Sequence, residues 1–305
     1  MVTIIVLNWN GLADTSACLE SLARLDDGVA HEVLVVDNGS TDGSPSVIRE
    51  RFPGVHVVET GKNLGFAGGN NVGLRWALER GSEYALLPND DTEVAPDFLR
   101  LLVEVAGSDP RIGMLGPTIY YYAEPQTVWS AGGSVDWRRG TTRMVGVGEQ
   151  DTGQFGESPR EMDFITGCAL LVKRDVLQRV GLLDERFFTY YEDTEWCVRA
   201  RRAGFKSVHV PRAKVWHKIP LDARESSTTV HYYMTRNRLL FLGTAGVGPV
   251  AWWNTLVGDY VRTLLSWSLR PRWGHKRAHR AAMVQAIGDA GRGRWGERTT
   301  DQERM

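Results

Sequence analysis

The chain has 305 residues, of which 42% are hydrophobic and 24% charged, enough apolar material for one large α/β domain with or without an appendage. Its 36 basic and 37 acidic residues nearly cancel, so the overall charge does not indicate a nucleic-acid-binding protein. Three cysteines, Cys18, Cys168 and Cys197, lack the paired spacing of a metal site and indicate buried thiols in a reducing compartment.

The first hundred residues alternate short apolar runs with helical patterns. This alternation predicts βαβ units on a parallel sheet, and the continuous apolar runs predict helices on both of its faces. The opening run VTIIVLN is expected to be the first strand rather than a signal peptide, because no basic segment precedes it. Strands are predicted over residues 2–8, 31–38, 55–59 and 84–88, and helices over 14–25, 44–52 and 70–81.

The later part of the chain is less regular. A helix is predicted over residues 97–109 and a strand within 111–122; a strand and a helix follow over 164–181, and an extended segment over 207–218. Residues 124–160 are rich in Gly, Trp and charge, and we expect an irregular excursion with a hairpin near 132–146. Long loops of this kind often form lids or substrate walls.

Polar residues follow each of the predicted parallel strands. They are Asn8 and Asn10, Asp37 and Asn38, the run from Glu59 to Asn63, and the run from Asn89 to Asp91. Ordinary turn chemistry explains any one of these groups. In an open α/β sheet, however, ligands bind beyond the carboxyl ends of the strands, so the groups together predict a binding edge.

Two glycine-rich nucleotide motifs are missing. The turn after the first strand reads NWNGLAD and lacks G-x-G-x-x-G, which excludes a dinucleotide-binding fingerprint. The run NLGFAGGNNVG lacks the Lys and Ser/Thr of a phosphate-binding loop. It is predicted to be a turn leading into a helix, able either to hydrogen-bond a ligand or to cap that helix.

The stretch LLPNDDTEV places two adjacent acids after an apolar strand. Neighbouring carboxylates repel one another, and a hard divalent cation such as Mg²⁺ or Mn²⁺ relieves that repulsion while leaving coordination positions for phosphates. The alternative is a surface turn in which Asp91 caps the following helix.

Several blocks of this sequence follow the order and approximate spacing of family 2 glycosyltransferases. They are TIIVLNWNG, VLVVDNGSTDGS, NLGFAGGNNVG, LLPNDDTEVAPDFL, FITGCALLVKRDV, GLLDERFFTYYEDTEWCVRARRAGF and VWHK. The sequence resembles this family over roughly residues 1–240, and most of all its rhamnosyltransferase-like branch. The resemblance implies an α/β fold of the GT-A type, with a Rossmann-like, mostly parallel central sheet flanked by helices and a helical C-terminal extension.

The resemblance also implies a domain organisation and a donor site. The catalytic domain would span residues 1–235, with a donor half over about 1–120 and an acceptor half over about 121–235, and the extension would span 236–305. Asn89-Asp90-Asp91 stands where the family has Asp-x-Asp, so Asp91 is the implied ligand of Mn²⁺ or Mg²⁺, together with His217. The implied donor-nucleotide contacts are Leu7, Asn8, Asp37, Asn38, Asn63, Gly65 and Asp90.

The block YYEDTEWCVRARRAG carries the implied catalytic residue. By resemblance, Asp193 is the general base that deprotonates the acceptor hydroxyl, and Gly167, Glu192 and Trp196 line the acceptor side. The plainer alternative is a well-capped surface helix, because acids at its start and arginines at its end complement the helix dipole.

The implied function is an inverting, metal-dependent transferase that moves a deoxyhexose or hexose from a dTDP- or UDP-sugar to a polysaccharide or lipid-linked glycan. L-rhamnose is one candidate sugar. Two alternatives stay open: a nucleotidyltransferase that makes a nucleotide sugar, and a non-catalytic scaffold that binds one. Release of pyrophosphate from a nucleoside triphosphate would favour the first, and failure to transfer from any donor the second.

The tail beyond about residue 232 is apolar and Trp-rich, then basic. Asp259, Arg262 and several Gly and Pro residues interrupt its apolar part, which makes it a poor membrane span. One hypothesis is an amphipathic helix on an anionic membrane surface, with Trp252, Trp253 and Trp267 at the interface and the protein on the cytoplasmic, inner face. The other is a helix packed on the catalytic domain or on a second subunit of a homo-oligomer.

Overall fold

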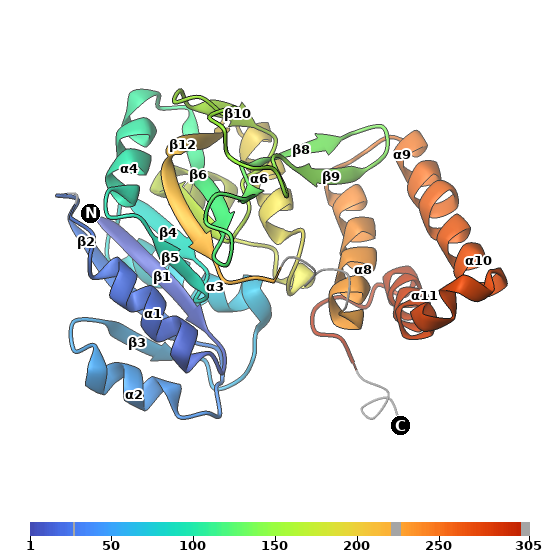
Figure 1. The fold of residues 1–305 in the computed structure, drawn as a ribbon, viewed down its shortest axis with the longest axis horizontal. Helices are drawn as coiled ribbons and strands as arrows, with labels where there is room; N and C mark the ends of the chain where they lie inside the picture. Colours follow the sequence, from blue (N-terminus) through green and yellow to red (C-terminus); the bar gives the residue numbers. More distant parts are fainter. Residues whose placement is uncertain (27, 221–226, 300–305) are drawn as a thin grey trace.

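The structure is a computed structural model that describes residues 1–26, 28–220 and 227–299 (Figure 1). Its centre is a ten-stranded sheet whose main path has the order β10-β12-β6-β11-β4-β1-β2-β3, with β5 beside β12 and β7 beside β6. Strands β3, β2, β1 and β4 are parallel, β11 runs against both neighbours, and β6 and β12 are parallel to each other. The strands are β1 (Val2–Asn8), β2 (His31–Asp37), β3 (His56–Glu59), β4 (Tyr84–Pro88), β5 (Thr92–Val94), β6 (Ile112–Tyr121), β7 (Val128–Ser130), β10 (Arg160–Met162), β11 (Ala169–Lys173) and β12 (Lys206–His217).

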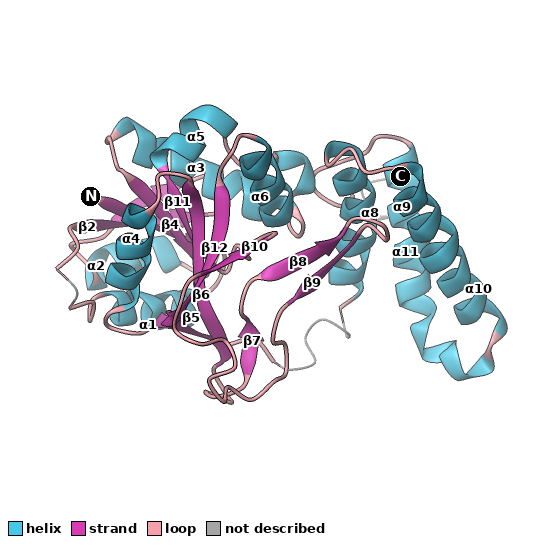
Figure 2. Cartoon of the chain, turned by 90° about the horizontal axis from the view of Figure 1, so that it is seen from above, coloured by secondary structure: helices cyan, strands magenta, loops and turns pink. Residues whose placement is uncertain are grey.

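Helices cover both faces of this sheet, as the continuous apolar strands predict (Figure 2). Helices α1 (Leu12–Leu22), α2 (Ser44–Arg51) and α4 (Phe98–Ser108) share one apolar core with the sheet. The other face holds α3 (Gly65–Glu79), α5 (Arg174–Val180), the short η1 (Glu185–Phe187) and α6 (Glu192–Arg202). All ten residues of β6 are buried, which fits a strand enclosed on both sides. The predicted α/β fold with a mostly parallel sheet is therefore confirmed.

One local prediction is wrong. The run NLGFAGGNNVG is not a turn before a helix, because α3 begins at Gly65 and the run forms its first turns. A Cβ added to Gly69 would lie 2.4 Å from Leu7, and one added to Gly73 would lie 2.3 Å from Ile5. The glycines therefore allow α3 to pack closely on β1.

The excursion over residues 124–160 contains the expected hairpin, formed by β8 (Gly133–Asp136) and β9 (Thr141–Met144). Figures 1 and 2 show this hairpin extending from the sheet toward the C-terminal helices. Its tip is held there because Arg238 Nε donates to the carbonyl oxygen of Gly140 at 2.8 Å.

The C-terminal extension is helical. It consists of α8 (Thr228–Thr244), α9 (Pro249–Trp253), the π-helical η2 (Asn254–Val261), α10 (Arg262–Leu269), η3 (Pro271–Lys276) and α11 (Arg277–Gly291). The predicted boundary after residue 235 lies within α8, and residues 300–305 of the predicted extension are outside the described part of the chain. No helix among the described residues is long and apolar enough to span a bilayer.

Candidate functional site

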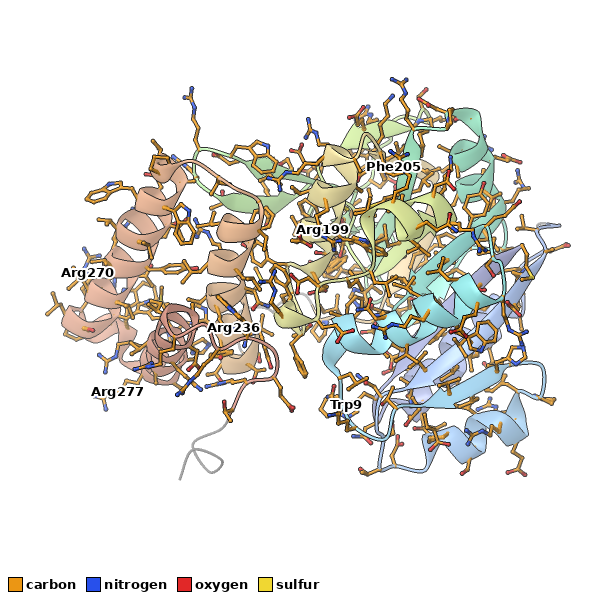
Figure 3. All side chains as sticks on the ribbon, turned by 180° about the vertical axis from the view of Figure 1, so that it is seen from behind. Trp9, Arg199, Phe205, Arg236, Arg270 and Arg277 are labelled. Carbon is orange, nitrogen blue, oxygen red and sulfur yellow. The ribbon has the colours of Figure 1, made fainter. Side chains whose placement is uncertain are left out.

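The carboxyl ends of β1, β2 and β4 lie side by side. In the parallel register of the first two strands Asn8 pairs with Asp37, and Leu7 forms an isolated bridge with Asn89 beyond β4. The strand-end groups that the sequence places in four separate turns therefore meet at one edge of the sheet. Trp9 lies at the same edge with its side chain 55% exposed (Figure 3).

Asn8 connects the elements of this edge. Its buried Nδ2 donates to Asp37 Oδ1 at 2.7 Å and to Ser44 Oγ at 2.8 Å, and its Oδ1 accepts from Thr15 Oγ1 at 2.8 Å. The side chain joins β1 and β2 to the helices that follow them. Its hydrogen-bonding atoms are thus used within the protein, so the donor contact predicted for Asn8 has no free side-chain atom to make it.

Asn38, Asn63 and Gly65 form the next part of the edge. Asn38 Nδ2 donates to Asn63 Oδ1 at 3.1 Å and to the Gly65 carbonyl at 3.2 Å, while Asn63 Oδ1 accepts from Gly65 N at 2.8 Å. Gly65 has φ of 73°, and a Cβ there would lie 2.5 Å from atoms of Phe188. Only glycine fits this conformation and this contact.

The two adjacent acids face different elements. Asp90 Oδ2 lies 3.4 Å from Thr15 Oγ1, at the start of α1. Burial, followed by the charges of Asp91 and Asp14, raises the pKa of Asp90 to about 7. Asp91 instead faces β12, where its Oδ1 lies 3.1 Å from Nε2 of His217.

The pair of Asp91 and His217 fits a divalent cation. Asp91 Oδ1 is buried and accepts no hydrogen bond from a described residue, because its approach to the His217 ring lacks hydrogen-bonding alignment. Neighbouring ligand atoms on an octahedral ion with bonds of about 2.1 Å are about 3 Å apart, close to the separation found here. Trp129 packs edge-on against the His217 ring at a centroid distance of 4.7 Å and fixes its orientation. Among the described residues no third His, Cys, Asp or Glu joins the pair, so a bound ion would keep positions for phosphate oxygens and water.

Asp193 lies in the first turn of α6. Its Oδ2 accepts from the backbone N–H of Gly167 at 2.8 Å, and its Oδ1 accepts from Thr194 Oγ1 at 3.1 Å. A Cβ on Gly167 would lie 3.0 Å from the Phe66 ring, so the glycine lets that ring pack closely beside this contact. The carboxylate is thus held in one orientation at a helix start, where the dipole favours negative charge.

The neighbouring acid has a different character. Glu192 is only 5% exposed, and its Oε2 has no hydrogen-bond partner among the described residues. Burial, and then the charge of Asp193, raises the pKa of Glu192 well above its usual value. Both effects favour the neutral acid at Glu192 over a second charge beside Asp193.

The prediction that Trp196 lines the acceptor side is wrong. Trp196 is fully buried, and its Nε1 donates to the Gly181 carbonyl at 2.8 Å. It belongs to the apolar core between α6 and the sheet, because this side of the helix packs inward. Its role is to anchor the helix that carries Asp193.

One cavity of about 380 Å³ is lined both by the pair of Asp91 and His217 and by the residues around Asp193. The predicted residues on its wall are Asp91, His217, Gly167, Glu192 and Asp193. The predicted nucleotide contacts on β1, β2 and α3 do not line it and form the adjoining edge. The cavity therefore holds Asp91, His217 and Asp193 together beside the edge formed by the strand ends.

Sequence reasoning missed several other residues of this wall. Trp129, Tyr190, Val230 and Met234 all line the cavity, the last two from α8. The hairpin contributes Thr142 and Met144 of β9, so part of the excursion over residues 124–160 lines the cavity. The missed aromatic and apolar residues have no distinguishing sequence pattern, because any core position carries the same residue types.

Comparison with protein families gives a match over residues 3–181 to the family model described as Glycosyl transferase family 2. The N-acetylglucosaminyl-diphospho-decaprenol L-rhamnosyltransferase of Mycobacterium tuberculosis is 30% identical over 261 residues, covering 78% of this chain and 79% of that protein. The dTDP-rhamnosyl transferase RfbF of Shigella flexneri is 25% identical over 224 residues, covering 69% of this chain and 70% of that protein.

Solved structures resemble the whole fold. The mannosyltransferase PcManGT from Pyrobaculum calidifontis, in complex with GDP-Man and Mn²⁺, has a TM-score of 0.59 at 16% identity and covers 95% of this chain and 86% of its own. Residues 1–349 of S. aureus TarS, in complex with UDP-GlcNAc, have a TM-score of 0.58 at 15% identity, covering 95% and 80%. At these identities the similarity concerns the fold, which is the GT-A type.

Proposed function

Because the chain belongs to glycosyl transferase family 2 and is a glycosyltransferase of the GT-A fold, we propose that it moves a sugar from a dTDP- or UDP-sugar to a polysaccharide or lipid-linked glycan. The observation that carries this proposal is the single cavity that holds the Asp91 and His217 pair on one wall and Asp193 on another. The named activities of the two rhamnosyltransferase relatives make L-rhamnose the first sugar to test.

In the proposed reaction Asp193 is the general base. Its carboxylate takes the proton from an acceptor hydroxyl, and that oxygen attacks the anomeric carbon as the bond to the diphosphate oxygen breaks. The Gly167 N–H holds the carboxylate in place at 2.8 Å, and the raised pKa of the buried Glu192 favours its neutral form beside that carboxylate. One displacement from the face opposite the leaving group inverts the anomeric configuration.

The leaving diphosphate would be stabilised at the wall that carries Asp91 and His217. Asp91 and His217 would hold Mn²⁺ or Mg²⁺, which when bound supplies charge stabilisation to the departing phosphate oxygens. The nucleoside would lie at the adjoining edge beside Asp37 and Asn63, and Asp90 would face it beside the start of α1. Asn38, whose amide donates to Asn63 and Gly65 and accepts from Leu64 N, would hold this edge in shape. Amide and carboxylate groups can pair with either uracil or thymine, so both donors are tested.

A thermal-shift panel of dTDP-, UDP- and GDP-sugars with Mn²⁺ or Mg²⁺ tests the donor. We expect a dTDP- or UDP-sugar to raise Tm by about 5 °C at roughly 100 times its Kd, and only when metal is present. The same donor should then pass its labelled sugar to a lipid-linked glycan. A panel without any metal-dependent shift, or pyrophosphate release from a nucleoside triphosphate, would contradict the proposal.

We further propose that the enzyme works at the cytoplasmic, inner face of the membrane, attached by α9, η2 and α10. Two of the three tryptophans predicted for that contact are unsuitable, because Trp252 and Trp267 pack on the core formed by Leu242, Tyr260 and Met283. The exposed side chains follow one another at intervals of three or four residues and form an apolar stripe: Val250, Trp253, Val257, Val261, Leu265 and Leu269. Leu269 is 75% exposed and Trp253 65%.

The charge of these helices suits an anionic lipid surface. Residues 249–299 hold nine Lys or Arg but only three Asp or Glu. The whole chain, in contrast, has nearly equal numbers, with 36 Lys or Arg and 37 Asp or Glu. From Arg262 to Arg280 there are six Lys or Arg and no acid, and Arg270 lies at the outer edge of the extension (Figure 3). A stripe of apolar side chains beside basic ones is the arrangement that binds an anionic interface.

Vesicle co-sedimentation of the full chain tests this attachment. We expect the double variant Leu265→Asp, Leu269→Asp to bind anionic vesicles at least about tenfold more weakly, because each leucine contributes roughly 1.5–3 kcal/mol when buried. The matched control is Val47→Asp, an exposed apolar residue of α2. Unchanged sedimentation would contradict the proposal, as would a variant that only turns a homo-oligomer into a monomer, which would identify the stripe as a subunit interface.

A further inference from the structure

The segment before the catalytic helix has an unusual backbone. Phe188, Tyr190 and Tyr191 have φ of 65°, 67° and 75°, and the only other described non-glycine residue with positive φ is Asn10. Bulky side chains rarely adopt this left-handed region. Such a conformation persists only where contacts with the surrounding structure outweigh the local backbone preference against it.

This segment joins the two sides of the site. Tyr191 immediately precedes Glu192 and so sets where α6 and its Asp193 begin. At its other end the Phe188 carbonyl accepts from Ala67 N at 3.1 Å, and its side chain fills the space that a Cβ on Gly65 would need. A change in the segment would therefore move the base relative to the donor edge.

Asn237 of α8 holds the segment through its carbonyls. Its fully buried Nδ2 lies 2.7 Å from the carbonyl oxygens of Phe187 and Thr189 and 2.9 Å from that of Tyr190. Its Oδ1 accepts from Arg236 Nε at 3.0 Å. Because a guanidinium only donates, this bond fixes the orientation of the amide and points its N–H groups at the carbonyls.

Arg236 supports the same segment. The side chain is fully buried, with Nη2 3.2 Å from the Phe187 carbonyl and Nη1 2.7 Å from the Gly296 carbonyl. Its guanidinium lies over the Tyr233 ring at 5.0 Å, and that ring stacks on Phe188 at 5.5 Å. Figure 3 shows Arg236 on α8, between the C-terminal helices and the catalytic part.

We propose that Asn237 and Arg236 are positioning residues for sugar transfer. They hold Phe188, Tyr190 and Tyr191 at the positive φ values that aim Asp193 at the cavity, although neither Asn237 nor Arg236 lines the cavity itself. Through these two residues, α8 positions the catalytic part from beyond the boundary predicted after residue 235. The inference rests on the proposed role of Asp193 as the general base.

Loss of the Asn237 amide would have a defined consequence. The carbonyls of Thr189 and Tyr190 would lose this donor, whereas that of Phe187 keeps Arg236, and the segment could relax toward negative φ, where aromatic residues are more stable. The start of α6 would shift with it. A displacement of about 1 Å at a reacting group can cost about 10²-fold in rate.

The test compares Asn237→Ala and Asn237→Asp with Tyr260→Phe. Asn237→Asp keeps the acceptor for Arg236 but faces the carbonyls with an oxygen instead of an N–H. Tyr260→Phe is the control. It removes the buried hydrogen bond from Tyr260 Oη to the carbonyl of Thr235, which is on α8 like Asn237 and lies outside residues 188–191. We measure kcat, donor KM and Tm, each assay at the same interval below the variant's own Tm.

We expect both Asn237 variants to lower kcat about 10²-fold with donor KM changed less than about threefold. Tyr260→Phe should lower Tm and keep kcat. Asn237→Ser, which retains one hydroxyl donor, should give an intermediate kcat and remains informative if the harsher variants do not fold. If Asp193→Asn is inactive but the Asn237 variants keep a kcat within about threefold of that of Tyr260→Phe, the inference is overturned and the base assignment stands. If Asp193→Asn is fully active, the base assignment and the inference are both overturned.

Discussion

Replacement of Asp193 with Asn is expected to lower the rate of transfer by about 10²- to 10⁴-fold, the usual contribution of general-base assistance. An amide cannot take the acceptor proton, yet its oxygen can still accept from the Gly167 N–H, as Asp193 Oδ2 does at 2.8 Å, so this contact should survive. Donor affinity should therefore stay within a few-fold of the wild-type value. Steady-state kinetics together with calorimetric titration of the donor separate the two effects.

The matched control for this experiment is Glu192→Gln. The two acids are adjacent on α6 and both line the cavity, but Glu192 favours the neutral form because burial and the charge of Asp193 raise its pKa. Glutamine resembles that neutral acid in shape and charge, so we expect most of the activity to remain at neutral pH. Full activity of Asp193→Asn, or inactivation of both variants alike, would contradict the assignment of the base.

Much of the fold and part of the site could be predicted from the sequence. Alternating strands and helices predict the sheet, and the general rule for strand ends predicts that Asn8, Asp37 and Asn89 meet at one edge. The register of β1 and β2 and the bridge of Leu7 to Asn89 show the same proximity. The sequence does not show that the Asn8 side chain forms its hydrogen bonds within the protein. A polar residue at a strand end is equally suited to stabilise a turn or to bind a ligand.

The residues supplied by the C-terminal helix could not be placed in advance. Val230 and Met234 reach the cavity wall, and Asn237 reaches the carbonyls of residues 187–190, only through the tertiary packing of α8. The run MTRNRLLFL did contain a signal, namely a polar block that includes Arg236 and Asn237 directly before an apolar run of the same helix. Buried polar groups need partners, and here those partners are backbone carbonyls of the segment before α6. Trp196 was misplaced for a related reason, because proximity to Asp193 in sequence does not fix which side of α6 faces the core.

The second large effect concerns Asp91 and His217. We expect Asp91→Asn and His217→Ala each to weaken metal-dependent binding of the donor nucleotide by at least about tenfold, because metal sites lose about 10- to 100-fold even when an outer partner is removed. Glu93→Gln is the matched control: it alters an acid two residues away that pairs with Lys218 and does not line the cavity. Chelation of the metal should reduce wild-type affinity to the level of the variants.

The most direct test of the proposed site is a calorimetric double-mutant cycle on these two residues. If Asp91 and His217 share one cation, removal of the second residue should add little to the loss caused by the first, and the cycle should be strongly non-additive. The coupling should vanish when the metal is chelated. Additive losses, or nucleotide binding unaffected by either change in the presence of metal, would contradict a shared cation at the end of β4.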